Sequence, residues 1–419
     1  MHDHTISPRV VRRLSLAVLI VGVGSALSGC INLPRYPAVP ATQTTQAVIS
    51  AAPGSRYWPD LDPSPLFREG LLSVDRELRM RQDDPRTTAG LPTASLLAIS
   101  GGGDNGAFAA GLLVGWTATG TRPTFKMVTG VSAGALIAPF AFLGSDYDNV
   151  LQHVSRSVEP HDIFHVRNFI EGLLGDGFAD ATPLAHLIAK YVTRDVLSAV
   201  AREYGRGRLL FIGTTNLDSG QRVIWNMGAI ADSADSHALQ LFRRVILASA
   251  AIPGVFSPVM VDVAVDGKRY QEMHVDGGVM NQAFLVPPRF IEEIDSYRAG
   301  DHRKRDIYVI RNGYLSGEWE TVARHTTTVA LRALDTLIDV QGISDLYRVE
   351  MASGQEHAQF HFAFIGHDFT YPHHRAFAPD YIQHLYQYAF DLATTGDPWR
   401  QRLPTRTWSP TAPSQATYP

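Results

Sequence analysis

The sequence predicts an α/β fold in which helices cover a mostly parallel β-sheet. From residue 94 onward, short apolar runs are each followed by glycine and then by a longer stretch with helical periodicity. This order is typical of strand-turn-helix units. The composition agrees, because 45% of the 419 residues are hydrophobic and only 19% are charged, which allows a sizeable core. We find no internal repeat and no second linker, so we treat residues 94–399 as one domain.

Two strand-turn-helix units open this domain. The first has its strand at 95–100, its turn at 101–106 and its helix at 107–119. The second occupies residues 125–143, with a tight turn at 130–134 between strand and helix. Further strands are expected at 209–214, 222–225, 271–275, 307–311 and 359–365, and further helices at 183–204, 239–250, 319–351 with breaks, and 381–392.

The N-terminus has the order of an export signal. Arg9, Arg12 and Arg13 precede an apolar stretch at residues 14–27. A helix that spans a bilayer needs about 20 residues, so this stretch is too short and fits the apolar segment of a cleaved signal peptide. We therefore expect residues 1–29 to be removed from the mature chain.

The residues that follow, Leu27-Ser28-Gly29-Cys30, resemble a bacterial lipobox. The resemblance implies that Cys30 is lipidated and becomes the first residue of the mature chain. Several acyl chains on one residue hold a protein stably to a membrane. By resemblance to lipoprotein sorting, Ile31 and Asn32 imply the outer membrane. We therefore expect a lipid-anchored protein of the bacterial cell envelope.

Residues 30–65 have the composition of a linker. They contain seven prolines and few core-forming residues, which predicts a semi-extended tether. The alternative is an ordered arm that docks on the domain through Tyr57, Trp58 and Leu61.

Two further segments flank the domain. Residues 66–93 lead into it, and apolar side chains spaced among charges predict one amphipathic helix at 65–82. Residues 400–419 follow the domain as a C-terminal tail.

The composition argues against several classes of function. Cys30 is the sole cysteine, so the chain forms no internal disulfide and holds no cysteine-based metal site. A formal net charge of −4, without a basic block beyond the N-terminus, argues against nucleic acid as a partner. The histidines show no metal-ligand spacing, and their only adjacent pair is His373-His374. No calcium loop of the D-x-D-x-D-G type is present. We expect neither a metal nor an organic cofactor.

The strongest chemical feature is the sequence Gly130-Val131-Ser132-Ala133-Gly134 between an apolar strand and an apolar helix. This is the context of a nucleophile elbow, in which a serine sits on a sharp strand-to-helix turn. Gly130 and Gly134 avoid steric overlap in such a turn. The helix N-terminus beside the serine favours developing negative charge. We therefore predict that Ser132 is a nucleophile.

A glycine-rich loop after the first strand offers backbone N–H donors. Acyl transfer needs such donors for the oxyanion of its tetrahedral intermediate, and glycines let the chain approach a substrate closely. The loop also matches G-x-G-x-x-G, but a dinucleotide site needs an acidic residue about 20 positions on, at the end of the next strand. That strand ends instead in Thr129-Gly130-Val131-Ser132, which disfavours a dinucleotide. The loop consists of Gly101, Gly102, Gly103, Asp104, Asn105 and Gly106.

A third feature, Asp276-Gly277-Gly278, follows the strand expected at 271–275. Together the three features resemble the patatin-like phospholipase family over residues 95–281, with weaker similarity at 214–220 and 248–258. The resemblance implies a three-layer α/β/α sheet with a nucleophile elbow. It also implies that Ser132 is the nucleophile, that Asp276 is the proton acceptor, that 101–106 is the oxyanion loop, and that no histidine takes part.

The family resemblance implies a serine acyl hydrolase of the phospholipase A or lysophospholipase type, with membrane lipid as substrate. A free aspartate has a pKa near 4, so the surroundings of Asp276 must raise its basicity. We therefore expect Asp276 to be partly buried and within hydrogen-bond reach of Ser132. The family usually has arginine where this chain has Asn105, a difference that bears on headgroup preference more than on hydrolysis.

Two other functions fit the sequence less well. An α/β-hydrolase with a Ser-Asp-His triad also uses G-x-S-x-G, and its histidine would be one of His302, His325, His361 and His367. That alternative explains neither the Asp-Gly-Gly motif nor the form of the glycine-rich loop. The second is a non-catalytic surface lipoprotein that binds a partner, against which the presence of both the serine and the aspartate argues.

Overall fold

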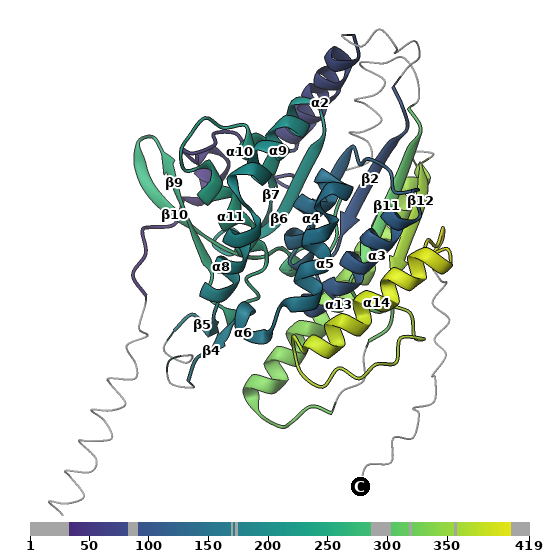
Figure 1. The fold of residues 1–419 in the computed structure, drawn as a ribbon. Helices are drawn as coiled ribbons and strands as arrows, with labels where there is room; N and C mark the ends of the chain where they lie inside the picture. The colour runs from purple at the N-terminus through teal and green to yellow at the C-terminus, as the bar shows by residue number, and fades with distance from the viewer. Residues whose placement is uncertain are drawn as a thin grey trace, which may run out of the picture.

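A computed structural model describes residues 33–82, 91–168, 171, 175–285, 303–317, 321–355 and 358–403. Its central sheet has nine strands, with helices on both faces (Figure 1). Five parallel strands run from β6 in the interior of this sheet to its edge at β12. In order across the sheet they are β6 (Leu209–Asn216), β3 (Met127–Gly130), β2 (Ala94–Ile99), β11 (Arg305–Arg311) and β12 (Gln359–Phe364).

Antiparallel strands extend the sheet beyond β6. β7 (Gln221–Asn226) pairs with β6, and β1 (Arg56–Tyr57) pairs with β7. A hairpin of β9 (Val259–Val265) and β10 (Lys268–Asp276) joins β6 through β10. A separate sheet is formed by β4 (His165–Val166), β5 (Gly177–Asp180) and β8 (Gly254–Phe256).

Side-chain alternation along β2 explains the cover on both faces. Leu97 and Ile99 belong to one apolar cluster, together with α3 (Gly106–Ala118), α4 (Ala133–Leu143) and α14 (Pro379–Thr395). Leu96 and Ala98 belong to the other, with α2 (Ser64–Gln82) and α13 (Thr326–Gln355). Successive strand side chains point to opposite faces, so a strand with apolar side chains on both faces needs helices on both. The predicted three-layer α/β/α architecture is confirmed. The other helices are α5 (Asp148–Ser157), α6 (Pro160–Ile163), α8 (Thr182–Tyr191), α9 (Arg194–Gly205), α10 (Met227–Ala231) and α11 (Ala238–Ser249).

Two differences from the predicted elements have local causes. The helix expected at 183–204 is two helices, because Thr193 starts α9 by accepting the N–H of Val196 on its side chain. The strand β9 is not predicted, although an Asp-Gly turn between two alternating runs is a hairpin signal. Asp266 and Gly267 form that turn, with φ of 49° and 74°.

The N-terminal arm, residues 33–63, is not the predicted tether. β1 pairs with β7, and the backbones of Val48 and Ala264 exchange two hydrogen bonds. Tyr57 and Trp58 are buried, as the alternative of an ordered arm requires, whereas Leu61 stays exposed. The prediction of a free tether is therefore wrong for the described part of this segment.

A buried ion pair also links the arm to the sheet. Arg56 pairs with Glu272 of β10, and both side chains are almost fully buried. Arg56 also donates to Ala47 O at 2.7 Å. Since breaking a buried pair leaves an uncompensated charge, the arm is held to β10 in spite of its prolines.

The ends of the chain frame the described region. Leu403 is buried and its N–H donates to Glu350 Oε1 at 3.0 Å, so packing continues past the predicted domain end at 399. The signal peptide, Cys30 and the last 16 residues of the predicted tail, 404–419, lie outside the described residues. Within the described ranges, every helix is too short or too polar to traverse a bilayer.

Candidate active site

Ser132 occupies a sharp turn between β3 and α4. Its backbone has φ 54° and ψ −123°, a conformation that is strained for residues other than glycine. The flanking glycines make room for the turn. A Cβ on Gly130 would lie 2.4 Å from Gly134 O, and a Cβ on Gly134 would lie 2.2 Å from Ile99 O. The turn thus has the geometry of a nucleophile elbow.

Ser249 at the end of α11 supports the elbow from behind. Its hydroxyl accepts the N–H of Ser132 at 3.0 Å and donates to Gly213 O at 2.7 Å. Ser249 is fully buried, and both of these hydrogen bonds are internal to the protein. The segment 248–258, which showed only weak family similarity, therefore contributes to the position of Ser132.

β3 and β10 meet end to end along one edge of β6. Gly130 at the end of β3 pairs with Ile212, and Asp276 at the end of β10 pairs with Thr214. β7 occupies the opposite edge of β6 over the same stretch. This register brings Ser132, two residues after Gly130, next to Asp276 although the two are far apart in the sequence.

The carboxyl of Asp276 is buried and lies close to the serine. Asp276 is 3% exposed, so it is more deeply buried than the sequence predicts. Its Oδ1 accepts the N–H of Gly278 at 2.7 Å. Burial raises the pKa of Asp276 to about 6, against the lowering effects of the nearby Ser132 hydroxyl and of the Gly278 N–H. The carboxylate is therefore a stronger base than a free aspartate.

Both glycines after Asp276 are closely packed, and at Gly277 the neighbour is backbone. A Cβ on Gly277 would lie 2.5 Å from Gly213 O. A Cβ on Gly278 would lie 2.5 Å from Gln282 Nε2 and 3.0 Å from Asp276 Oδ1. A side chain at Gly277 would therefore overlap the backbone of β6, and one at Gly278 would displace the amide of Gln282 and crowd the Asp276 carboxyl.

The glycine-rich loop lies against the elbow. Gly102 and Gly103 have φ of 150° and 57°, which favours glycine. A Cβ on Gly101 would lie 3.0 Å from Ser132 Cβ, and a Cβ on Gly106 would lie 3.0 Å from Ala133 Cβ. In the part of the chain that the structure describes, the N–H groups of Gly102 and Gly103 donate to no other group.

Asn312 fastens this loop and is not predicted from the sequence. Its Nδ2 donates to Ser100 O at 2.8 Å, and its N–H donates to Ser100 Oγ at 2.9 Å. Its Oδ1 accepts the N–H of Ala109 at 3.0 Å. Asn312 directly follows β11, and a polar side chain at the end of a buried strand is the sequence signal that would have found it.

The polar side chains of the loop turn away from Ser132. Asp104 Oδ2 accepts the N–H of Phe377 at 2.6 Å and lies 2.8 Å from His373 Nε2. Asn105 Oδ1 accepts the hydroxyl of Tyr381 at 2.6 Å. These two members of the predicted oxyanion loop therefore anchor it to α14 and the segment before α14, and only its backbone is left to face a substrate.

An apolar cavity of about 130 Å³ lies beside the loop and the elbow. Gly103 and Gly106 border it on one side, and Ala133, the neighbour of Ser132, borders it as well. Its wall is mostly apolar, and the helices α4, α5 and α8 contribute much of it, which suits an alkyl chain. The wall includes Leu136, Ile137, Phe140, Val154, Leu187 and Ile246.

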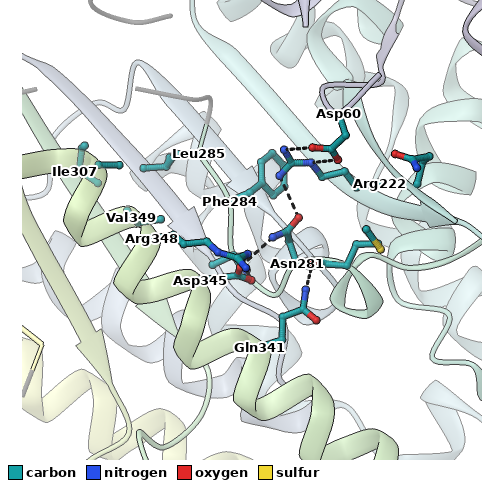
Figure 2. Close-up of a pocket in the computed structure, with 14 residues that line it drawn as sticks. Asp60, Arg222, Asn281, Phe284, Leu285, Ile307, Gln341, Asp345, Arg348 and Val349 are labelled. Atoms are coloured by element: carbon teal, nitrogen blue, oxygen red, sulfur yellow. Dashed lines mark hydrogen bonds and ion pairs between the residues drawn. The ribbon is translucent and has the colours of Figure 1, made fainter. Parts of the chain in front are cut away.

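A larger cavity of about 540 Å³ lies on α13 and the segment after Asp-Gly-Gly (Figure 2). Its charged groups are already paired with one another. Arg222 forms an ion pair with Asp60 and donates to Asn281 Oδ1. Arg348 on α13 pairs with Asp345 one turn away. We assign no ligand to this cavity.

Asp345 links α13 to the catalytic segment. Its side chain is almost fully buried, and its carboxyl accepts Asn281 Nδ2 at 3.0 Å and the N–H of Gln282 at 2.7 Å. Gln341 on the same helix donates to Met280 O. α13 thereby holds the backbone just beyond Asp276, a role that the sequence does not reveal.

The candidate triad histidines lie elsewhere. His361 stacks on Tyr308 and His367 on Tyr314, while His325 is exposed just before α13. His302 lies outside the described residues. Among the residues that the structure covers, no histidine is hydrogen-bonded to Ser132 or Asp276, and no cluster of three His, Cys, Asp or Glu side chains is placed to hold a metal.

The model of the patatin-like phospholipase family matches residues 97–287. These residues form a patatin-like phospholipase domain. The patatin-like domain contains the glycine-rich loop, the elbow and Asp276, whereas β11, β12, α13 and α14 follow the matched range. The crystal structure of VipD from Legionella pneumophila is similar over 73% of this chain and 68% of that one, at 12% identity and a TM-score of 0.36. No curated relative matches the sequence.

Proposed function

We propose that the patatin-like domain hydrolyses acyl esters of membrane lipids, with Ser132 as nucleophile and Asp276 as proton acceptor. The observation that carries the proposal is that the Ser132 hydroxyl lies close enough to the buried Asp276 carboxyl to lower its pKa, where the ends of β3 and β10 meet on β6. A nucleophile next to its base, beside a helix N-terminus and a glycine-rich loop, suits acyl transfer.

The first half of the reaction acylates the serine. The Ser132 oxygen attacks the ester carbonyl carbon while its proton passes to Asp276. With a pKa of about 6, Asp276 is mostly ionised at pH 7 and still basic enough to accept that proton. When the tetrahedral intermediate collapses, Asp276 gives the proton to the leaving alcohol oxygen. The acyl group stays on Ser132.

The second half releases the fatty acid. Water attacks the carbonyl carbon of the acyl-Ser132 ester, and Asp276 accepts its proton. As the new intermediate collapses, that proton returns to the Ser132 oxygen. The free acid leaves, and Asp276 is ionised again. One carboxyl serves both halves, so the cycle needs no histidine.

The negative oxygen in both intermediates needs hydrogen-bond donors. The N–H of Ser132 is engaged by Ser249, so the glycine-rich loop is the better source. The N–H groups of Gly102 and Gly103 are free within the described residues, and the N-terminus of α4 adds favourable potential. We infer that these two N–H groups bind the oxyanion.

A lipid of the phospholipase A or lysophospholipase type is the substrate class that we infer. The apolar cavity beside Ser132 supplies a place for the acyl chain. The side chains of Asp104 and Asn105 are engaged with the segment around α14, so neither is free to select a headgroup.

We also propose that the enzyme is anchored at the outer membrane through a lipidated Cys30. The lipobox-like sequence before this cysteine supports the anchor. Metabolic labelling of cells with an alkyne fatty acid tests it. We expect the wild-type chain to be labelled in the outer-membrane fraction, and Cys30→Ser to lose the label. A wild-type chain without label would contradict the anchor.

The hydrolase proposal is tested by product analysis. Vesicles of phosphatidylcholine and lysophosphatidylcholine are incubated with wild type or Ser132→Ala, and fatty acids are measured by mass spectrometry. We expect release by wild type and a loss of about 10³-fold or more in Ser132→Ala. In parallel, a fluorophosphonate probe should label wild type at Ser132. Folded wild-type protein that is neither labelled nor active would overturn the proposal in favour of a binding role.

Histidine variants separate the dyad from a triad. Replacing His302, His325, His361 and His367 in turn by alanine should leave ester hydrolysis within about threefold of wild type. A triad enzyme would lose about 10⁴-fold on loss of its histidine. Such a loss in any one variant would overturn the dyad while leaving a serine hydrolase.

A further inference from the structure

Gln282 places a side-chain amide beside both reacting groups. A Cβ on Gly101 would lie 2.3 Å from Gln282 Oε1 and 3.0 Å from Ser132 Cβ. A Cβ on Gly278 would lie 2.5 Å from Gln282 Nε2 and 3.0 Å from Asp276 Oδ1. The amide therefore fills the space that two glycines leave open, with one end toward the serine and the other toward the aspartate.

The main chain of Gln282 is fixed on both sides. Its N–H donates to Asp345 Oδ2 at 2.7 Å, and its carbonyl accepts the N–H of Gly101 at 3.2 Å. A Cβ on Gly342 of α13 would lie 3.2 Å from both Cβ and Cγ of Gln282. The stem of the side chain is thus packed against a helix, and this packing directs the amide toward the catalytic centre.

The amide of Gln282 is available to a small polar molecule. Gln282 is only 6% exposed, and within the described part of the chain its side-chain nitrogen and oxygen form no hydrogen bond. Neither atom is among the fully buried atoms without a partner, so both keep some contact with solvent. An amide that water can reach, next to a nucleophile and its base, is therefore placed to bind a polar molecule that enters during the reaction.

We propose that Gln282 is a third catalytic residue, whose amide hydrogen-bonds the water that hydrolyses the acyl-Ser132 ester. The proposal rests on the function proposed above. The water gives its proton to Asp276, and its oxygen forms the new bond to the acyl carbon. Gln282 neither gains nor loses a proton and orients the water. Attack by Ser132 itself, which precedes the water, does not depend on the amide.

The test separates acylation from deacylation in the full-length protein. Gln282→Met keeps the length of the side chain and removes the amide. Gln387→Met on the exposed face of α14 is the matched control. The rate of Ser132 labelling by a fluorophosphonate probe measures attack by the serine. Release of p-nitrophenol from p-nitrophenyl butyrate gives a burst for acylation and a steady state for deacylation.

For Gln282→Met we expect a labelling rate within about threefold of wild type and a steady-state turnover at least about tenfold lower. Acyl-Ser132 should accumulate, seen as a burst near one p-nitrophenol per enzyme and as an added acyl mass. Unchanged turnover would overturn the inference. A parallel fall in labelling and turnover would also overturn it, because general support of the site lowers both.

A second variant, Gln282→Glu, tests where the side-chain amide lies relative to Asp276. In Gln282→Glu a carboxylate faces Asp276 and raises its pKa, so the acid limb of the labelling rate should move to higher pH by about one unit. An unmoved limb would contradict the placement of the amide. Wild-type protein that the probe fails to label would overturn the proposed function and this inference with it, whereas a labelled wild type with normal Gln282 variants overturns the inference alone.

Discussion

The two halves of the active site are built in different ways. The half that carries Ser132 is local, because β2, the glycine-rich loop, β3 and α4 all lie within residues 94–143. Its shape is set by glycines whose side chains would overlap backbone atoms. The half that carries Asp276 is assembled from β6, α11, the N-terminal arm and α13. Sterics within one short segment thus shape the nucleophile turn, and Ser249 and Asn312 only add hydrogen bonds to this half. Burial and contacts from distant segments provide most of what positions the base.

The largest effect is expected in the local half. In Gly134→Ala the new Cβ would meet Ile99 O at 2.2 Å, an overlap with backbone that cannot relax cheaply. We expect about 3 kcal/mol of lost stability and loss of probe labelling. Soluble yield and the thermal midpoint measure the change. Gly205→Ala is the control, since a Cβ there meets nothing within 4 Å. A Gly134→Ala variant with the stability and activity of wild type would contradict the view that steric constraints shape the Ser132 turn.

The next effect belongs to the base. Asp276→Asn keeps the size and burial of the side chain but removes the proton acceptor, so hydrolysis should fall by about 10²–10⁴-fold. The fold should survive, in contrast to the local half. Fatty acid release and circular dichroism measure the two properties. Activity within tenfold of wild type would mean that another group is the base.

A smaller effect is expected at Asp345, which acts on the base from α13. In Asp345→Asn one acceptor becomes a donor that faces the N–H of Gln282 or the amide of Asn281, and turnover should fall about tenfold. Asp339→Asn changes an exposed carboxyl on the same helix and should leave turnover unchanged. Equal turnover in the two variants would show that α13 does not position the site.

The pH dependence of kcat/KM tests whether the base is buried. Asp276 must be ionised to act as base, so kcat/KM should rise about tenfold per pH unit up to a pKa of about 6 and then level off. The pH–rate profile on a soluble ester measures this. A limb near pH 4 would indicate an exposed carboxyl.

The raised pKa of Asp276 also makes the stability of the fold depend on pH. Activity should rise with pH, whereas stability should fall. The folded pKa of Asp276 is raised from 3.8 to about 6, so between these pH values the folded state holds the proton that the unfolded state has lost. Stability from this group therefore falls as pH rises, by about 3 kcal/mol in all. Asp276→Asn should be more stable than wild type at pH 8 and equal to it at pH 3. The denaturant midpoints of wild type and Asp276→Asn at pH 3 and pH 8 measure this difference.

The sequence predicts the local features well and the assembled ones poorly. Strands, helices and the Ser132 turn follow from periodicity and glycine placement within short windows. Asp276 is found because its motif sits beside two glycines. Gln282, Asn312 and Asp345 lie in no motif, and their roles depend on contacts across the fold. The composition of the arm is misleading because its prolines predict a tether, whereas its order depends on distant contacts: the pairing of β1 with β7, the burial of Tyr57 and Trp58, and the ion pair of Arg56 with Glu272.

The docked arm changes the reach of an anchored enzyme. Arg35 already binds Asp218 and Gln271 O, so only four residues separate this docking point from Cys30. Fully extended, the five residue-to-residue steps from Cys30 to Arg35 span at most roughly 18 Å. A protein attached at Cys30 would therefore have its folded domain held close to the membrane surface. The point where the arm leaves the body would then decide which side of the enzyme meets the bilayer.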